Sequence, residues 1–344
     1  MIYIVGQGLA GTWLSYFLYK KGVPFRVIDD GDPQSSSRIA GGVMNPVTGR
    51  RMVETWMSET LFPFAFKQYS AIGNLLNESL IEEIPIYDFF SSPDRKLVFD
   101  KRFAENDIRL SVPEDQELTD RFFNAPFGYG CIHGAYLVHL QTMLKSWRAF
   151  LEERQLLENK KTDTMDYQIW LENNDKVIFS TGSAAAAHPL FSLLPFSPTK
   201  GECLILKIPE LPAHALYKKQ FALVPWQNNT WWAGSNYLHQ YSNTGPDPAF
   251  YQALSGWLRS FLKVPFEILS HFAAIRPTTV DRRPFAGFHP LFPNLGILNG
   301  LGTKGVSLAP WLACLLTEKI VGSDALPAEV DIARFRKILS RADY

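Results

Sequence analysis

The chain begins with Ile2-Tyr3-Ile4-Val5-Gly6-Gln7-Gly8-Leu9-Ala10-Gly11, a short apolar run that leads into three glycines spaced G-x-G-x-x-G. The run predicts a buried strand, and the apolar residues that follow at helical spacing predict a helix ending near Lys21. In such a unit the glycines permit a tight turn, a close approach of pyrophosphate to the backbone, and close packing of helix on strand. The spacing therefore predicts a dinucleotide site, with these candidate contacts: Gly6, Gly8, Leu9, Ala10 and Gly11.

An acidic residue follows the second predicted strand, residues 24–28. Asp29 lies where a carboxylate commonly binds the ribose hydroxyls of a dinucleotide, and a carboxylate there repels the 2′-phosphate of NADP. Asp30 takes this position if the register shifts by one residue. NAD and FAD are equally compatible with this unit.

A loop of small residues comes directly after the acid, Ser35-Ser36-Ser37-Arg38-Ile39-Ala40-Gly41-Gly42-Val43-Met44-Asn45-Pro46. Small side chains leave backbone N–H groups free to face phosphates or a flat ring, which favours FAD, although an ordinary flexible loop is the alternative. The candidate cofactor contacts in this loop are Ser37, Arg38, Ala40, Gly41, Gly42 and Val43.

A second glycine-rich segment lies near the other end, Asn299-Gly300-Leu301-Gly302-Thr303-Lys304-Gly305-Val306-Ser307-Leu308-Ala309-Pro310. It predicts a helix over about 306–320, starting near Leu308 because proline is tolerated only in the first turn. A helix N-terminus offers free N–H groups and positive partial charge, which suit a reduced flavin ring. The candidate contacts are Gly300, Gly302, Thr303, Lys304, Gly305 and Val306.

The charge and cysteine content of the chain bear on which partners the protein can bind. The 344 residues carry 34 Lys plus Arg and 34 Asp plus Glu, so no global field attracts nucleic acid or an anionic membrane, and we expect neither partner. The apolar residues 1–19 fit the dinucleotide-binding unit better than a leader or membrane segment. Three cysteines without metal-type spacing favour a reducing, cytoplasmic location, and we expect no metal site.

These segments together resemble the family of FAD-dependent amine oxidoreductases that contains D-amino-acid oxidase, glycine oxidase and sarcosine oxidase. Further marks of the resemblance are Val177-Ile178-Phe179-Ser180-Thr181-Gly182, Pro198-Thr199-Lys200-Gly201-Glu202 and Ala233-Gly234-Ser235. The chain is also similar to the flavin domain of the bifunctional enzyme that matures a wobble uridine in tRNA. The resemblance implies FAD contacts at Thr181 and Gly182. It also implies non-covalent FAD, because the only cysteine near the carboxyl end, Cys314, falls inside a predicted helix.

The resemblance also implies roles for substrate-binding residues. Arg276 matches the arginine that holds the substrate carboxylate, a natural task for a planar guanidinium. Lys304 either adds charge near flavin or substrate or points to water, and we include both residues as catalytic candidates. The pocket candidates beside Arg276 are Met44, Asn45 and Trp56. We assign no catalytic histidine, because a neutral amine needs no general base.

The expected fold class is α/β (α+β overall), with a Rossmann-like FAD-binding domain and a mainly antiparallel-sheet substrate domain. The FAD-binding domain is predicted to be discontinuous, with the pieces 1–55, 132–200 and 272–344. The substrate domain is predicted to comprise 56–131 and 201–271, with strands over 202–208, 220–224, 230–234 and 266–275. Helices are predicted over 137–153 and within 246–262.

The leading function is oxidation of the C–N bond of a small amino acid or N-substituted glycine by hydride transfer to flavin N5, with oxygen or another acceptor taking the electrons. One alternative is a tRNA-modifying flavoenzyme that oxidises a glycine-like group on a wobble base; the basic pairs Arg50-Arg51 and Lys218-Lys219 favour it and the zero net charge opposes it. Another alternative is a non-catalytic flavin-binding module.

Overall fold

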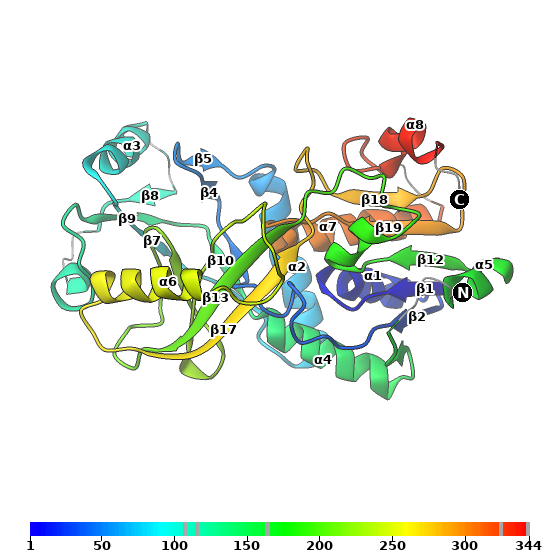
Figure 1. Cartoon of the computed structure of the whole chain (residues 1–344), viewed down its shortest axis with the longest axis horizontal. Helices are drawn as coiled ribbons and strands as arrows, with labels where there is room; N and C mark the ends of the chain where they lie inside the picture. The colour runs from blue at the N-terminus through cyan, green and yellow to red at the C-terminus, as the bar shows by residue number, and fades with distance from the viewer. Residues whose placement is uncertain (106, 108, 114–116, 162–165, 323–325, 342–344) are drawn as a thin grey trace.

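The computed structural model of the protein describes residues 1–105, 107, 109–113, 117–161, 166–322 and 326–341. Two halves, each built on its own large sheet, lie side by side along the long axis of the molecule (Figure 1). The long strands β13 (Thr199–Lys207) and β17 (Glu267–Arg276) run from one half towards the other.

A mostly parallel six-stranded sheet forms the first half, in the order β11–β2–β1–β12–β19–β18, with only β18 antiparallel to its neighbour. Ile4 at the centre pairs with Val27 on one side and Ile178 on the other, and all three are fully buried. Such burial is typical of a parallel sheet covered on both faces. The strands are β1 (Ile2–Val5), β2 (Phe25–Ile28), β11 (Leu157–Glu158), β12 (Lys176–Phe179), β18 (Phe285–Phe288) and β19 (Leu295–Asn299).

Helices pack around this sheet and share one apolar core with it. In α4 the apolar side chains recur at helical spacing, and Trp147 is fully buried, with its Nε1 donating to Ser15 Oγ at 2.8 Å. The helices that contribute to this core are α1 (Leu9–Lys20), α2 (Ser58–Leu76), α4 (Leu140–Glu153) and α7 (Gly305–Ile320).

The helix predicted over about 306–320 is observed as α7, but it begins earlier than the position of Pro310 indicates. It starts at Gly305, so Pro310 lies in its second turn and not in its first, and the predicted start near Leu308 is wrong. Proline has no N–H, which leaves the carbonyl of Val306 without its helical donor. The hydroxyl of Tyr69 in α2 donates to that carbonyl at 2.9 Å. A neighbouring helix therefore supplies the hydrogen bond that Pro310 cannot make.

An eight-stranded sheet forms the second half, in the order β17–β13–β16–β15–β14–β7–β9–β8, antiparallel except between β14 and β7. Helix α6 (Pro248–Phe261) covers one face, and its residues Phe250, Leu254, Leu258 and Phe261 share a core with Tyr217. The remaining strands are β7 (Ile86–Phe89), β8 (Leu110–Ser111), β9 (Tyr129–Ile132), β14 (Leu216–Lys218), β15 (Ala222–Pro225) and β16 (Trp231–Gly234).

Smaller elements complete the described part of the chain. A three-stranded antiparallel sheet combines β3 (Val43–Met44), β10 (Tyr136–Val138) and β6 (Ile81–Glu83). The other elements are β4 (Val47–Thr48), β5 (Val53–Glu54), α3 (Pro93–Ala104), α5 (Asp166–Glu172) and α8 (Arg336–Leu339), with short helical turns at 118–122, 182–187, 227–229 and 332–335.

The predicted fold class is confirmed: a Rossmann-like parallel sheet is combined with a mainly antiparallel one. The helix predicted over 137–153 begins only at Leu140, because residues 136–138 form strand β10. The division into discontinuous domains stays a prediction. No helix in the described ranges combines the length and apolarity that a membrane crossing requires.

Candidate active site

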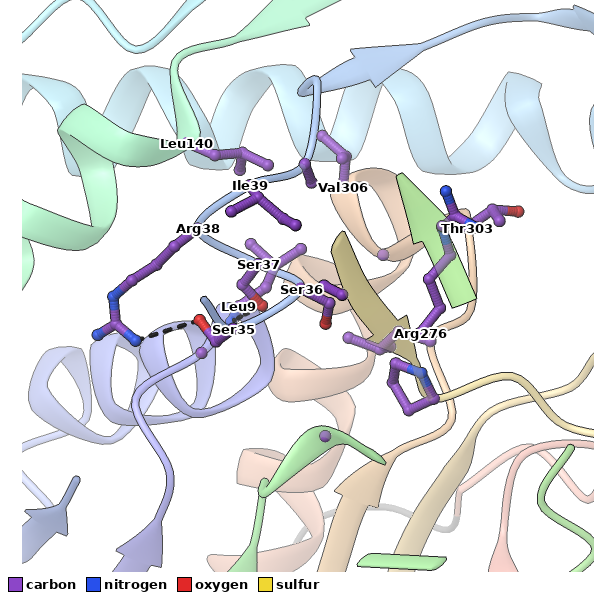
Figure 2. A pocket seen from close by; sticks show the side chains of 18 of the residues that line it. Leu9, Ser35, Ser36, Ser37, Arg38, Ile39, Leu140, Arg276, Thr303 and Val306 are labelled. Atoms are coloured by element: carbon purple, nitrogen blue, oxygen red, sulfur yellow. Dashed lines mark hydrogen bonds between the residues drawn. The ribbon is translucent and has the colours of Figure 1, made fainter. Parts of the chain in front are cut away.

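A cavity of about 970 Å³ lies between the two large sheets. Its walls include the carboxyl ends of β1, β2, β12 and β19, the usual ligand-binding edge of an open parallel sheet. In Figure 2, loop residues Ser36 and Ser37 cross the middle of the view, with Arg38 on one side and Arg276 and Thr303 on the other. The cavity thus joins the segments that the sequence singles out at both ends of the chain.

The first glycine motif opens helix α1 onto this cavity. Gly6 has a φ of +101°, and a Cβ there would lie 2.6 Å from the carbonyl oxygen of Ser180. A Cβ on Gly11 would lie 1.8 Å from the Gly6 carbonyl oxygen, so Gly11 serves packing and does not line the cavity, whereas Gly8, Leu9 and Ala10 do. The N-cap residue of α1, Gly8, has no side chain to cap the helix, and Ser37 Oγ accepts a hydrogen bond from the Leu9 N–H at 3.0 Å. The positive end of the helix therefore faces the cavity, where it suits an anion.

Asp29 at the end of β2 is held firmly by the protein. Its carboxylate accepts hydrogen bonds from the backbone N–H groups of Gln7, at 2.7 Å, and Gly31, at 2.8 Å. Arg148 Nη1 donates to it at 2.7 Å, and Arg38 Nη2 lies 3.5 Å away. Asp30 is exposed, although it also lines the cavity. The geometry therefore favours Asp29 as the ordered acid of the pair.

The loop of small residues is pressed between the two halves. Gly42 has a φ of +74°, and a Cβ on it would lie 2.1 Å from the Val138 carbonyl oxygen, so only glycine fits. A Cβ on Gly41 would lie 3.3 Å from the indole ring of Trp232, whose Nε1 donates to the Ile39 carbonyl at 2.9 Å. Trp232 on β16 thereby ties the loop to the eight-stranded sheet. The predicted contacts in this loop all line the cavity, namely Ser37, Arg38, Ala40, Gly41, Gly42 and Val43.

The second glycine segment places another uncapped helix end at the cavity. Gly302, Thr303, Gly305 and Val306 line it, and no side chain caps α7. Asn299, which precedes this segment, donates from Nδ2 to the Gly182 carbonyl at 2.9 Å and so joins the segment to the end of β12. Thr181 and Gly182 at that end also line the cavity.

Two predicted contacts in this segment are not among the residues that line the cavity. Gly300 has a φ of +73° and packs against Thr279 and Phe285. Lys304 occupies the N-cap position of α7 outside the cavity lining. Burial and the nearby guanidinium groups of Arg283 and Arg282 lower the pKa of Lys304.

The residues present fit FAD. Two uncapped helix ends suit the charge of a pyrophosphate and of a reduced flavin ring, and an ordered acid stands at the ribose position. The buried Oγ of Ser180, which lines the cavity, has no hydrogen-bond partner among the described residues, as expected for a group that meets a ligand. Of the three cysteines only Cys203 lines the described cavity, and burial raises the pKa of its thiol to about 12.

Arg276, the last residue of β17, places a guanidinium in the cavity on the side of the eight-stranded sheet. Its guanidinium donates to Ser235 Oγ at 2.8 Å and to the Asn236 carbonyl at 3.2 Å, and it lies 5.7 Å from the Tyr237 ring centroid. Burial lowers the pKa of Arg276, and none of the described carboxylates forms an ion pair with it. The charge of Arg276 is therefore left for an anionic ligand.

A buried carboxylate orders the loop that holds Arg276. Glu202 is 1% exposed and accepts hydrogen bonds from Asn236 Nδ2 at 3.2 Å and from the Asp247 backbone at 2.7 Å. His271 Nε2 lies 3.1 Å away and Lys200 Nζ 3.5 Å away. Since Lys200 compensates Glu202, this carboxylate positions Asn236 without neutralising Arg276.

Not all predicted pocket residues reach the cavity. Asn45 lines it, but Met44 is 2% exposed and packs in the core of the six-stranded half. Successive residues of an extended segment point to opposite sides, so Val43 and Asn45 face the cavity while Met44 faces away. Trp56 packs against the same core and lies 4.1 Å beneath the guanidinium of Arg283. Met44 and Trp56 therefore do not line the described cavity, and their assignment to the substrate pocket stays a prediction.

Sequence reasoning missed several cavity residues. The alternation of residues along the strands of the second sheet is the signal that could have found most of them. They are Ser180, Gly201, Cys203, Leu216, Lys218, Ala222, Val224, Trp232 and Ser235. No cluster of potential metal ligands occurs in the part of the chain that the structure describes.

The parallel sheet and the two glycine-rich helix N-termini at the cavity are those of a dinucleotide-binding protein. A family profile described as FAD dependent oxidoreductase (DAO) matches residues 1–319, and the chain belongs to this family. The protein is thus an FAD-dependent oxidoreductase, as the sequence predicts.

Solved structures with the same fold extend the comparison. Glycine oxidase from Bacillus cereus superposes with a TM-score of 0.74 at 16% identity, covering 100% of this chain and 99% of that one. Iminodiacetate oxidase from Chelativorans sp. gives 0.73 at 17% identity, covering 96% and 98%. L-proline dehydrogenase from P. horikoshii gives 0.74 at 15% identity, covering 98% and 97%. These likenesses establish the shared fold.

Proposed function

We propose that the protein oxidises the C–N bond of an amino acid or N-substituted glycine, with the substrate carboxylate bound by Arg276. The similar solved structures include enzymes named for glycine, iminodiacetate and proline, which are all amines that carry a carboxylate. This chemistry is consistent with the family to which the chain belongs.

The observation that carries the proposal is the unpaired charge of Arg276. A half-buried guanidinium whose acceptors among the described residues are all neutral is costly unless a ligand supplies the anion. A carboxylate matches its planar fork and can accept two parallel hydrogen bonds. The substrate is then held by one end, with its amine-bearing carbon directed into the cavity.

A bound FAD would supply the hydride acceptor; the substrate would then lose its C–H bond, its C–N bond would become C=N, and one proton would leave the nitrogen. The protein's own residues bind and orient. Ser235 and Asn236 fix the guanidinium, and Trp232 holds the small-residue loop against the second sheet. Oxygen or another acceptor of two electrons is needed to complete the cycle.

Replacing Arg276 with methionine tests the proposal. A charge-assisted contact contributes about 1.5–3 kcal/mol, so the apparent affinity for amino-acid substrates should fall about ten- to a hundredfold. The measurement is anaerobic bleaching of flavin absorbance with D-amino acids, glycine, sarcosine and proline, alongside the FAD content of the purified protein.

Arg283→Met is the matched control, because it removes the same charge from a guanidinium that stacks on Trp56 outside the cavity lining. Its substrate affinity should stay within about twofold of the parent. Equal losses in both variants, or bleaching unaffected by Arg276→Met, would count against a carboxylate at Arg276.

A further inference from the structure

One face of the eight-stranded sheet is the floor of the cavity's substrate side. Most lining residues on these strands form pairs two positions apart: Gly201 and Cys203, Leu216 and Lys218, Ala222 and Val224, Trp232 and Gly234, Ala274 and Arg276; the buried Glu202 also lines the cavity. Residues two apart on a strand share one face of the sheet. The cavity therefore extends from β17, where Arg276 lies, across four neighbouring strands to β14.

Lys218 ends a row of small residues on this floor. The strand register places Cys203 opposite Gly234, Gly234 opposite Ala222, and Ala222 opposite Lys218. Because these side chains are small, they leave space in the cavity between Arg276 and Lys218. Leu216 and Val224 flank the row, so the surface between the cations is apolar.

The charge of Lys218 is only weakly compensated. Its Nζ lies 3.7 Å from Asp88 Oδ1, and its side chain is 30% exposed. Asp88 is 2% exposed and already forms an ion pair with Arg95 through its other oxygen. One carboxylate thus faces two cations at this end of the cavity, which leaves a net positive charge beside an apolar floor.

The two cations are too far apart for a small amino acid to reach both. The guanidinium of Arg276 lies over Gly201. From there, Lys218 is three strands away across the sheet and two residues away along it, or about 14 Å by about 7 Å at ordinary strand spacings. Even when the lysine side chain reaches back, a gap of about 10 Å remains.

We propose that Lys218 forms a second anion-binding subsite, and that the substrate is an elongated amino acid with a distal carboxylate or phosphate. This inference rests on the proposed function, because Arg276 must hold the first carboxylate. An apolar linker of the substrate then lies over Ala222, Val224 and Trp232, and the distal anion meets Lys218. Charge at both ends selects against glycine-sized amines, which leave the second cation and the apolar floor without contacts.

Binding of non-oxidisable ligands to the FAD-loaded protein tests this subsite. Calorimetry compares the dicarboxylates malonate, glutarate, suberate and sebacate with the monocarboxylates propionate, valerate, octanoate and decanoate. We expect the second carboxylate to strengthen binding about tenfold only in the long pairs, since only these reach both cations. A long phosphonocarboxylate in the same series distinguishes a distal phosphate group from a distal carboxylate.

The variant Lys218→Gln should abolish the advantage of the long dicarboxylates and leave short monocarboxylates unchanged. Lys219→Gln is the matched control, because this neighbouring lysine lies over the Phe261 ring and bonds the Asn124 carbonyl, away from the cavity. Wild-type protein that binds sebacate no better than decanoate would overturn the subsite, whatever the variants do. A Lys218→Gln variant that weakens propionate as much as sebacate would also overturn it.

Failure of the subsite is distinguishable from failure of the proposed function. If Arg276→Met leaves propionate binding unchanged, the first carboxylate is not bound by Arg276 and both proposals fail. If Arg276→Met weakens propionate and the long dicarboxylates gain nothing from Lys218, only the second subsite fails.

Discussion

The guanidinium of Arg276 lies directly over the backbone of Gly201. A Cβ on Gly201 would be 1.9 Å from Arg276 Nη2 and 2.1 Å from Cζ, so any other residue there would displace the guanidinium. In the antiparallel register of β13 and β17, Gly201 pairs with Ala274 and Arg276 pairs with Thr199, so Gly201 and Arg276 are diagonal neighbours. Glycine at 201 therefore determines where the candidate carboxylate-binding group can lie.

Gly201→Ala should thus act on the substrate and not on the cofactor. We expect about tenfold weaker apparent substrate affinity, because the guanidinium must leave Ser235 and Asn236, while FAD content stays unchanged. Anaerobic titration of flavin bleaching measures it. Gly256→Ala in α6, where a Cβ meets nothing within 4 Å, is the control and should be neutral or slightly stabilising. Normal affinity in Gly201→Ala would contradict this role.

Asp29→Asn should lower FAD affinity. The change leaves Arg148 without its anionic partner and weakens the bond from the Gln7 backbone, at a cost of about 1.5–3 kcal/mol for hydrogen bonds to a charged group. The measurement is the FAD dissociation constant from fluorescence titration of the apoprotein. Asp30→Asn, which alters an exposed acid, should change it by less than about twofold. The reverse ranking would assign the ribose position to Asp30.

Tyr69→Phe should destabilise the protein by about 1–3 kcal/mol, because it leaves the buried Val306 carbonyl without a donor. Urea unfolding followed by circular dichroism measures the change. Tyr136→Phe is the control, since the Tyr136 hydroxyl makes no hydrogen bond to any described residue, and its cost should stay within about 0.5 kcal/mol. A neutral Tyr69→Phe would show that α7 tolerates Pro310 unaided.

His188 makes stability fall in acid. Burial lowers its pKa from 6.5 to about 4, and its ring packs on Phe179 at a centroid distance of 4.4 Å. The neutral form is thus favoured in the folded state, so its contribution is full above pH 6.5 and is lost as the pH falls towards 4. Urea unfolding over this range should show a shallower loss in His188→Asn, which keeps an acceptor for Leu190 N–H. An unchanged slope would contradict the role.

The sequence predicts those features of the site that depend on a single short segment of the chain. The spacing of Gly6, Gly8 and Gly11 predicts the strand–turn–helix unit, and the small residues from Ser35 to Val43 predict a close approach to a ligand. Both expectations depend on short-range sterics, which a few consecutive residues determine. Pro310 shows the limit, because its tolerance in α7 depends on a hydroxyl from a distant helix.

The amino-acid order alone therefore specified the nucleotide-binding unit and the mixed fold class, since glycine spacing and periodic apolar residues encode local backbone geometry, whereas the role proposed for Arg276 came from the family resemblance. Only the folded chain decided which side chains share the cavity. It turned Met44 into the core, left Lys304 out of the cavity lining and brought Lys218 into a row with Cys203. Strand register and packing between distant segments set these positions, because contacts at long range are made only when the sheets assemble.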